Sequence, residues 1–222
     1  MKLTRMIALL ALLCLPGLLF AQDKAAAKGA AKAAAAPKAT AKPQGMPMPA
    51  TDPEMKKLSK ILAGTWTVSE SAPPSEMMPK GGTGHGESVI SRGPGGNSLL
   101  QNYHSQSAMG KFAGHGVIWY DPQDKGFKNI WCDTMTPSGC SMFNGTGKWE
   151  DDKLVFSGTQ DMMGKTEQVK ETISDVTPNS FTFTIESGAD ANSMKTFMTL
   201  KYAKKAGGAA GMKSEEKAPA KP

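Results

Sequence analysis

Ten short segments with strand character follow one another from about residue 64 to residue 202, with turn residues between them. No helical pattern interrupts this series. Neighbouring strands of this kind must bury one face of their sheet and must also deal with its two unpaired edges. Closing the sheet into a barrel does both, and a barrel of this size can enclose a small ligand. The sequence therefore predicts an all-β fold, a closed antiparallel up-and-down β-barrel of about ten strands.

A short amphipathic helix is predicted directly before the first strand. Asp52 is a suitable N-cap, Pro53 fits the first helical position, and the apolar residues up to Leu62 fall on one side. A stretch rich in Pro, Gly and Met, residues 72–84, is predicted to be a loop over one end of the barrel. The predicted strands are residues 64–68, 87–91, 98–105, 111–120, 127–134, 140–149, 153–159, 166–176, 180–186 and 194–202.

Alternation between apolar and polar residues is clearest late in the chain. Phe181, Phe183 and Ile185 alternate with polar residues, and Met198, Leu200 and Tyr202 share one side of the last strand. One wet face and one dry face per strand is typical of antiparallel sheets.

The N-terminus has the pattern of a secretion signal. Lys2 and Arg5 supply the positive start, an apolar run covers residues 6–20, and Ala21 is a small residue suited to cleavage. The run is too short for a comfortable membrane span. We expect residues 1–21 to be a cleaved signal peptide, and the mature protein to be periplasmic or secreted without a membrane span.

Two segments rich in Ala, Lys and Pro, residues 22–51 and 205–222, flank the predicted barrel domain at residues 52–204. They have no apolar face to bury, so we expect both to be disordered. The formal charge of the whole chain is +6, yet residues 51–203 hold 14 basic and 17 acidic residues, a net charge of −3. The basic character thus belongs to the signal and the tails, and the domain has no mark of a nucleic-acid binder. The tails act either as spacers or as weak contacts with anionic envelope components.

Cys132 and Cys140 are the two cysteines that remain once the signal, with Cys14, is removed. An oxidising compartment favours a disulfide between them. They lie on either side of a plausible turn at Thr136 and Pro137, so they can face each other across one hairpin. A catalytic redox pair is not indicated, because there is no Cys-x-x-Cys spacing and no helix start to lower a thiol pKa.

The same hairpin register predicts which side chains line the interior. If Cys132 opposes Cys140, then Phe127 and Trp131 share a face with Phe143 and Trp149, opposite the cysteines. This aromatic face is the predicted interior, and it also carries Asn129, Asp133 and Ser141. Such a lumen suits a small amphipathic ligand, although the same polar groups also suit a filled core with trapped waters.

Two motifs resemble known families. Gly64-x-Trp66 after a short helix resembles the start of lipocalin-like (calycin) barrels, in which the Trp closes one end. The run from Gly114 to Asp121 and the residues after it resemble the bacterial family called domain of unknown function 1579, over about residues 58–204. The resemblance implies a closed antiparallel barrel with a cavity and implies no activity. The matching residues are Gly114-His115-Gly116-Val117-Ile118-Trp119-Tyr120-Asp121, then Phe127, Trp131, Asp133 and Thr134.

Nucleotide and catalytic motifs are not indicated. Gly158 and Gly164-Lys165-Thr166 echo a phosphate-binding loop, but five residues separate the glycines and no helix is predicted to follow. Gly114-x-Gly116 lacks the third glycine of a dinucleotide site. No nucleophile elbow and no Ser–Lys or Cys–His pair can be identified from spacing, so we predict a non-catalytic protein without a cofactor.

Metal binding is a weaker alternative. His85, His104 and His115 have no spacing that would bring them together on one face, so we predict no metal site among them. Clustered methionines can hold Cu(I), or can equally form a hydrophobic gate or fill an irregular core. The clusters are Met46 with Met48, Met77 with Met78, and Met162 with Met163.

The sequence thus predicts an exported barrel that binds a small hydrophobic or amphipathic ligand in its lumen. A structural or envelope-interaction module with a filled barrel is the first alternative, and copper handling is the second. The candidate ligand-binding residues are Trp66, Tyr103, Trp131, Asp133, Phe143 and Phe183.

Overall fold

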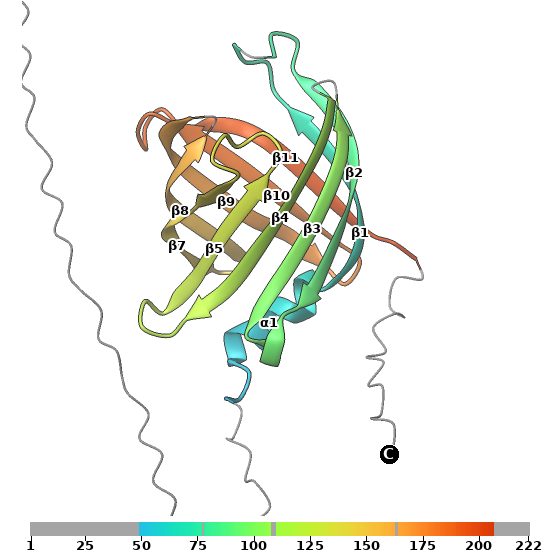
Figure 1. Ribbon diagram of the computed structural model, residues 1–222, viewed down its shortest axis with the longest axis vertical. Coiled ribbons are helices and arrows are strands. Elements are labelled where there is room, and N and C mark those ends of the chain that lie inside the picture. The colour runs from blue at the N-terminus through green and yellow to red at the C-terminus, as the bar shows by residue number, and fades with distance from the viewer. Residues whose placement is uncertain (1–48, 77, 108–109, 163, 207–222) are drawn as a thin grey trace, which may run out of the picture. The chain divides into compact units, whose positions relative to one another are not determined.

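The computed structural model describes residues 49–206 except residues 77, 108–109 and 163. The predicted signal peptide and nearly all of both predicted tails lie outside these residues. The helix α1 (Pro53–Leu62) and a 3₁₀ turn at Pro94–Gly96 accompany a single antiparallel sheet (Figure 1). Its strands are β1 (Gly64–Ala72), β2 (Gly82–Arg92), β3 (Ser98–Ser107), β4 (Gly110–Asp121), β5 (Gly126–Asp133), β6 (Cys140–Met142), β7 (Asn144–Glu150), β8 (Lys153–Met162), β9 (Lys165–Thr177), β10 (Ser180–Gly188) and β11 (Lys195–Lys204).

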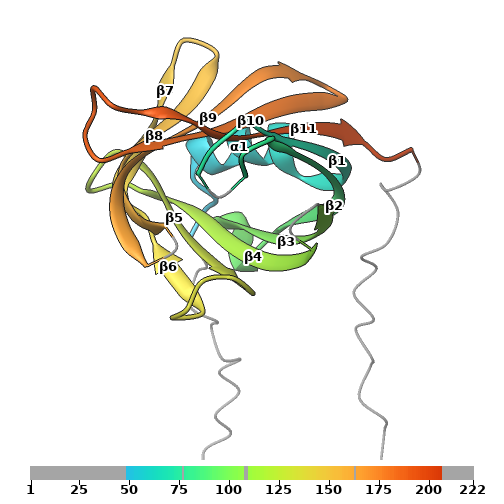
Figure 2. The same cartoon turned by 90° about the horizontal axis from the view of Figure 1, so that it is seen from above.

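The sheet closes on itself. Strands that follow one another in the chain pair, except that β6 and β7 both pair with β5 and not with each other. The ring is completed by β1, which pairs with β11 (Trp66 opposite Lys204), and β4 pairs with β5 (Gly116 opposite Trp131). Seen from above, the strands form a ring, with α1 inside its outline (Figure 2). The predicted closed up-and-down barrel is confirmed.

One predicted strand, residues 140–149, is divided into β6 and β7 at Phe143. Between the pairs Ile130–Met142 and Phe127–Gly147, β5 advances three residues while the opposing chain advances five. The extra residues form a bulge, which is why one predicted strand becomes two and the barrel keeps ten positions around its ring. Lys128 Nζ binds the Gly145 carbonyl oxygen (3.0 Å) beside this bulge.

The first loop is shorter than predicted. Ala72 pairs with Gly82, so β1 and β2 continue toward the turn, and the predicted loop 72–84 narrows to residues 73–81. Gly82, Gly84 and Gly86 all pair with β1 as part of β2, although glycine is typical of turns. Pairing with the neighbouring strand therefore determines the local structure here more than composition does.

Helix α1 has the bounds predicted for it, and it closes one end of the barrel. The Asp52 carboxylate caps it by accepting the Glu54 N–H (2.8 Å). Its apolar side, Met55, Leu58 and Leu62, is buried against the barrel. From the barrel, Trp66 Nε1 donates to the Leu62 carbonyl oxygen (2.9 Å).

A second tryptophan holds the outer part of the same helix. Trp149 Nε1 donates to Glu54 Oε2 (2.8 Å), and Lys57 Nζ lies 3.7 Å from the centroid of the Trp149 ring. Both ends of α1 are therefore tied to strands of the barrel.

The core is densest beside α1. Trp66 is fully buried and meets Phe181 edge to face with ring centroids 4.9 Å apart, and Phe181 stacks on Tyr202 at 4.2 Å. Both ends of the described chain lie at this end too. Thr51 Oγ1 donates to the Gly95 carbonyl oxygen (2.8 Å), and Lys205 N donates to the Thr65 carbonyl oxygen (2.9 Å).

Candidate ligand-binding cavity

The half of the barrel away from α1 encloses a cavity of about 260 Å³. Leu62 of α1 lies at its floor together with Phe181 and Tyr202. At the opposite end the lining includes Lys111 and Asp161, which are both exposed to solvent. The cavity therefore opens at the end of the barrel opposite α1, and we call this opening the mouth.

Most of the cavity wall is apolar and aromatic. Phe112 and Trp131 stack nearly parallel, with ring centroids 6.4 Å apart and an interplanar angle of 9°. The rings of Phe183 and Phe197 and the side chains of Ile118 and Ile185 add to the wall. An apolar wall offers water few hydrogen-bond partners, so this part of the cavity favours an apolar ligand.

Two glycines make room for Trp131. A Cβ on Gly114 would lie 2.4 Å from Trp131 Cζ2, and a Cβ on Gly116 would lie 2.8 Å from Trp131 Cε3. The indole therefore lies flat across β4, and only glycine fits beneath it. The Gly-x-Gly motif is thus explained by packing against an aromatic ring.

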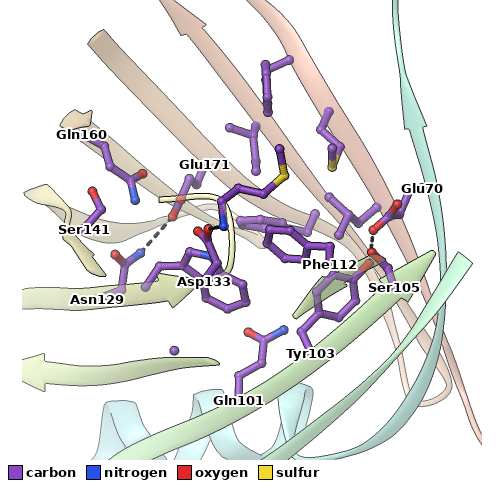
Figure 3. Close-up of a pocket in the computed structure, with 18 of the residues that line it drawn as sticks. Glu70, Gln101, Tyr103, Ser105, Phe112, Asn129, Asp133, Ser141, Gln160 and Glu171 are labelled. Carbon is purple, nitrogen blue, oxygen red and sulfur yellow. Dashed lines mark hydrogen bonds between the residues drawn. The ribbon is translucent and has the colours of Figure 1, made fainter. Parts of the chain in front are cut away.

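Four buried or half-buried polar side chains form one side of the lining, and we call them the polar wall: Asn129 of β5, Ser141 of β6, Gln160 of β8 and Glu171 of β9 (Figure 3). Asn129 Nδ2 donates to Glu171 Oε2 (2.9 Å). Burial raises the pKa of Glu171 from its ordinary value of 4.5 to about 7, while the Asn129 hydrogen bond acts in the opposite direction.

A second polar group lies on the wall formed by β1, β2 and β3. The Tyr103 hydroxyl donates to Glu70 Oε1, next to Ser105 (Figure 3). Burial, followed by this contact with Glu70, raises the pKa of Tyr103 above its ordinary value. Near the floor, Gln101 Nε2 donates to Ser88 Oγ (3.0 Å) and to the Tyr202 hydroxyl (3.3 Å).

Asp133 lines the cavity near the mouth, but its carboxylate is occupied by the neighbouring loop. Oδ1 accepts the backbone N–H groups of Met135 (2.7 Å) and Thr136 (2.6 Å), and Oδ2 accepts the Thr136 hydroxyl (2.9 Å). The acidic residue of the Trp-x-Asp-Thr motif therefore shapes the loop after β5.

The candidate residues divide into two groups. Tyr103, Trp131, Asp133 and Phe183 line the cavity. Trp66 and Phe143 do not, which corrects their predicted place in the lumen. Trp66 is buried beneath the floor by its hydrogen bond to α1, and Phe143 packs edge to face on Phe156 (5.9 Å) at the β6–β7 bulge. For the four lining residues, a role in binding stays a prediction.

Sequence reasoning missed Glu70, Gln160 and Glu171 as cavity residues. The alternation of each strand could have identified them, because the period of two places these polar residues on the same face as buried apolar residues. Val169 and Ile173 are buried on β9 with Glu171 between them at the same period of two.

The predicted disulfide between Cys132 and Cys140 is present, and it joins β5 to β6. Neither cysteine lines the cavity, as the predicted register requires. The disulfide therefore fixes the hairpin that carries Trp131 and Ser141 without contributing to the cavity surface.

His85, His104 and His115 are exposed on β2, β3 and β4. Within the described part of the chain, no group of three or more His, Cys, Asp or Glu side chains is placed to hold a metal ion. Among the predicted methionine pairs, Met77 and Met163 lie outside the described residues, as do Met46 and Met48. Met78 lines a smaller pocket of about 20 Å³ with Met198 beside the mouth.

No helix within residues 49–206, as far as they are described, is long and apolar enough to cross a membrane.

A closed antiparallel barrel, with a helix across one end and a lined cavity open at the other, is a lipocalin-like barrel. Residues 51–204 match the model of the family described as "Protein of unknown function (DUF1579)", and the chain belongs to this family. The family suggested by the Gly-x-Gly and Trp-x-Asp motifs is thereby confirmed. No curated protein matches the chain.

Solved structures share the fold at low sequence identity. The crystal structure of Rv2717c from M. tuberculosis is 12% identical, with a TM-score of 0.51 over 70% of this chain and 99% of that chain. The S-type phycobiliprotein lyase CPES from Guillardia theta is 12% identical, with a TM-score of 0.47 over 68% and 92% of the two chains. EF1p2_mFAP2b bound to DFHBI is 14% identical, with a TM-score of 0.38 over 68% and 99%. At these identities the likeness concerns the fold, and the last two scores carry no functional argument.

Proposed function

We propose that this protein is exported and binds a small apolar or amphipathic ligand in the lumen of its barrel, without catalysing a reaction. One observation carries the proposal: the interior is packed beside α1 but holds a cavity of about 260 Å³ that opens at the other end. An engineered cavity of about 150 Å³ in another protein holds benzene, so this one has room for about ten non-hydrogen atoms.

Export is supported by the signal-like segment at residues 1–21 and by the disulfide. A disulfide between Cys132 and Cys140 persists in an oxidising compartment and is rare in the cytosol. Localisation to the periplasm or the exterior is part of the proposal.

The non-catalytic part of the proposal is supported by the state of the Tyr103–Glu70 pair. General acids and bases work best with a pKa near the working pH. Burial and Glu70 shift the pKa of Tyr103 upward, away from neutrality. Glu171 has a pKa of about 7 but lies beside an amide, Asn129, and no nucleophile is hydrogen-bonded to it in the described chain.

Binding can be tested by filling the cavity. Ser105 lines it, whereas the next residue, Gln106, is exposed on the same strand. We expect Ser105→Phe to abolish the binding of a small neutral aromatic such as phenethyl alcohol, measured by calorimetry, and Gln106→Phe to leave it unchanged. Native mass spectrometry of protein purified from its host should show a bound small molecule in the wild type. A wild-type protein that carries nothing and binds no small aromatic or lipid would overturn the proposal.

A further inference from the structure

The polar wall contains side chains that the protein itself leaves without partners. Gln160 is only 7% exposed and lines the cavity, yet within the described residues its amide has no hydrogen bond. Ser141 is also 7% exposed and is likewise without one there. Glu171 uses Oε2 for Asn129, and no described residue binds its Oε1 (Figure 3). Since buried polar groups normally have partners, these atoms are available to a ligand in the cavity.

The charge of the lining is one-sided. Four carboxyl groups line the cavity against one lysine, Lys111, which is exposed at the mouth. Asp133 is occupied by its loop and Glu70 by Tyr103. Glu171 remains as the buried carboxyl whose charge no basic side chain of the described lining balances. The ionisable lining residues are Glu70, Tyr103, Lys111, Asp133, Asp161, Glu171 and Tyr202.

The remainder of the lining also suits a cation. The faces of aromatic rings attract ammonium groups, and the attraction grows in a desolvated site. Tyr103 and Phe112 lie on the other side of the cavity from Glu171 and Gln160 (Figure 3). Trp131 stacks on Phe112 and is the strand partner of Ser141, so it lies beside the polar wall. A carboxylate together with aromatic rings is a combination that recognises an organic ammonium ion and disfavours a carboxylate or phosphate.

We infer that the lumen selects small apolar amines, with the ammonium group on Glu171 and Gln160 of the polar wall and the apolar body among the aromatic side chains. This inference rests on the proposed function and names the ligand class of the same cavity. An amine donates hydrogen bonds to Glu171 Oε1 and to the Gln160 amide oxygen, which are the acceptors that the fold leaves open.

Binding of an amine is coupled to the proton on Glu171. Burial holds the pKa of this carboxyl at about 7, whereas a bound ammonium ion favours its ionised form. The groups that face Glu171 are Phe156 of β8 and Ile185 of β10 beside it, Asn129 of β5, and Tyr202 of β11, whose own pKa is raised by burial and by this carboxyl. None of them titrates between about pH 6 and about pH 8. The affinity for an amine is therefore expected to rise about tenfold over this range.

The test compares three probes of similar shape: phenethylamine, phenethyl alcohol and phenylacetate. Calorimetry with the full mature chain at about pH 8 should rank the amine about tenfold tighter than the alcohol, and the acid weakest. At about pH 6 the amine should bind about tenfold more weakly than at pH 8 and should release about one proton, measured in buffers of different ionisation enthalpy. The alcohol should show neither effect.

Two variants separate the role of Glu171 from general effects of charge. Glu171→Gln should remove both the preference for the amine and the release of the proton. Glu150→Gln, which changes an exposed carboxyl of β7 outside the cavity, should retain both. If Glu171→Gln does not fold, the proton release of the wild type still decides the matter.

The outcomes distinguish the two proposals. If the alcohol binds but the amine binds no tighter, or shows no dependence on pH, the amine inference is overturned and lumen binding stands. If none of the three probes binds the wild type, the proposed function itself fails together with the inference.

Discussion

Glu171 is the residue at which the needs of folding and of binding conflict. It occupies an inward position of β9 between the buried Val169 and Ile173, where an apolar side chain would be more stable. One amide, Asn129, compensates one of its two oxygens. The other oxygen faces a cavity rather than a protein partner.

This conflict predicts how stability depends on pH. In the unfolded chain Glu171 ionises near its ordinary pKa of 4.5, but in the folded chain its pKa is about 7. The folded state thus holds the proton more tightly, so its stability falls as the pH rises from 4.5 to 7 and is then constant. The loss amounts to about 3 kcal/mol at most. Glu171→Gln should lose this dependence and should be the more stable protein at about pH 8 in urea unfolding, whereas Glu150→Gln should follow the wild type. Parallel pH profiles for wild type and Glu171→Gln would contradict the argument.

Gly114 is predicted to be essential for the position of Trp131. Its backbone φ is not in the left-handed region, so the requirement for glycine comes from the indole that covers it. Gly114→Ala should displace Trp131 and lower the unfolding free energy by about 1–3 kcal/mol, with a shift in tryptophan fluorescence. His115→Ala, at an exposed position of the same strand, serves as the control. An unchanged emission spectrum in Gly114→Ala would show that the ring is not held by this contact.

At the residue scale, the sequence predicts the face of a side chain better than its depth. The period of two correctly placed Trp131, Asn129, Asp133 and Ser141 on the cavity side. It could not tell that Trp66 lies below the floor, because that depth depends on where α1 docks. Glu171 was missed because a single carboxyl in a strand is ordinarily a solvent-facing residue.

Helix α1 closes one end of the barrel, so that the interior is a cavity with a floor and not a tube open at both ends. Leu58 is fully buried, and Leu62 lies both in the core and at the cavity floor. The helix could be predicted to its ends because its cap, its first-turn proline and its apolar side all agree. The strand 140–149 was predicted as one piece because a bulge leaves no mark in apolar periodicity.

Removing the anchor of α1 should destabilise the barrel as a whole. Leu58→Ala deletes a fully buried side chain, so we expect a loss of about 2–5 kcal/mol in the free energy of unfolding. Lys60→Ala, on the exposed side of the same helix, should change stability little. Chemical denaturation of both variants measures the difference, and equal stability would mean that α1 is not part of the cooperative unit.

The disulfide should stabilise the β5–β6 hairpin and leave the cavity unaffected. It closes a loop with a sequence separation of eight residues. In the chain-entropy model such a loop is worth about 2.5 kcal/mol. The double variant Cys132→Ser with Cys140→Ser should lose about this amount in denaturant unfolding, and reduction of the wild type should reproduce it. Phenethyl alcohol should bind the double variant as it binds the wild type, and a parallel loss of binding would contradict the assignment of the disulfide to the outer surface.

At the scale of the whole molecule, closure of the sheet follows from composition and order alone. An unbroken series of antiparallel strands removes both of its edges when the first strand pairs with the last, and here β1 pairs with β11. What composition does not determine is how much of the interior is filled. That depends on local contacts such as the one at Gly147, where the Phe156 ring occupies the space that a Cβ would need.

The charge of the sequence differs in sign between the two predicted tails and the predicted domain. The tails carry +4 (residues 22–50, five Lys and one Asp) and +3 (residues 204–222, five Lys and two Glu), whereas residues 51–203 carry −3. The mature chain should therefore sediment with vesicles of anionic phospholipid and release them at high salt. A variant reduced to residues 49–206 should lose this binding but keep its unfolding free energy and its affinity for phenethyl alcohol, since the core and cavity lie within those residues. Lost ligand affinity in the truncated variant would show that the tails belong to the binding site.

The pairing of the first strand with the last also has a directional consequence. Thr51 and Lys205, near the two limits of the described chain, are both held beside α1, at the pole opposite the mouth. A tether attached through either terminus would hold the α1 end of the barrel toward the anchoring surface. The mouth of the cavity would then face away from that surface, toward solutes that arrive by diffusion.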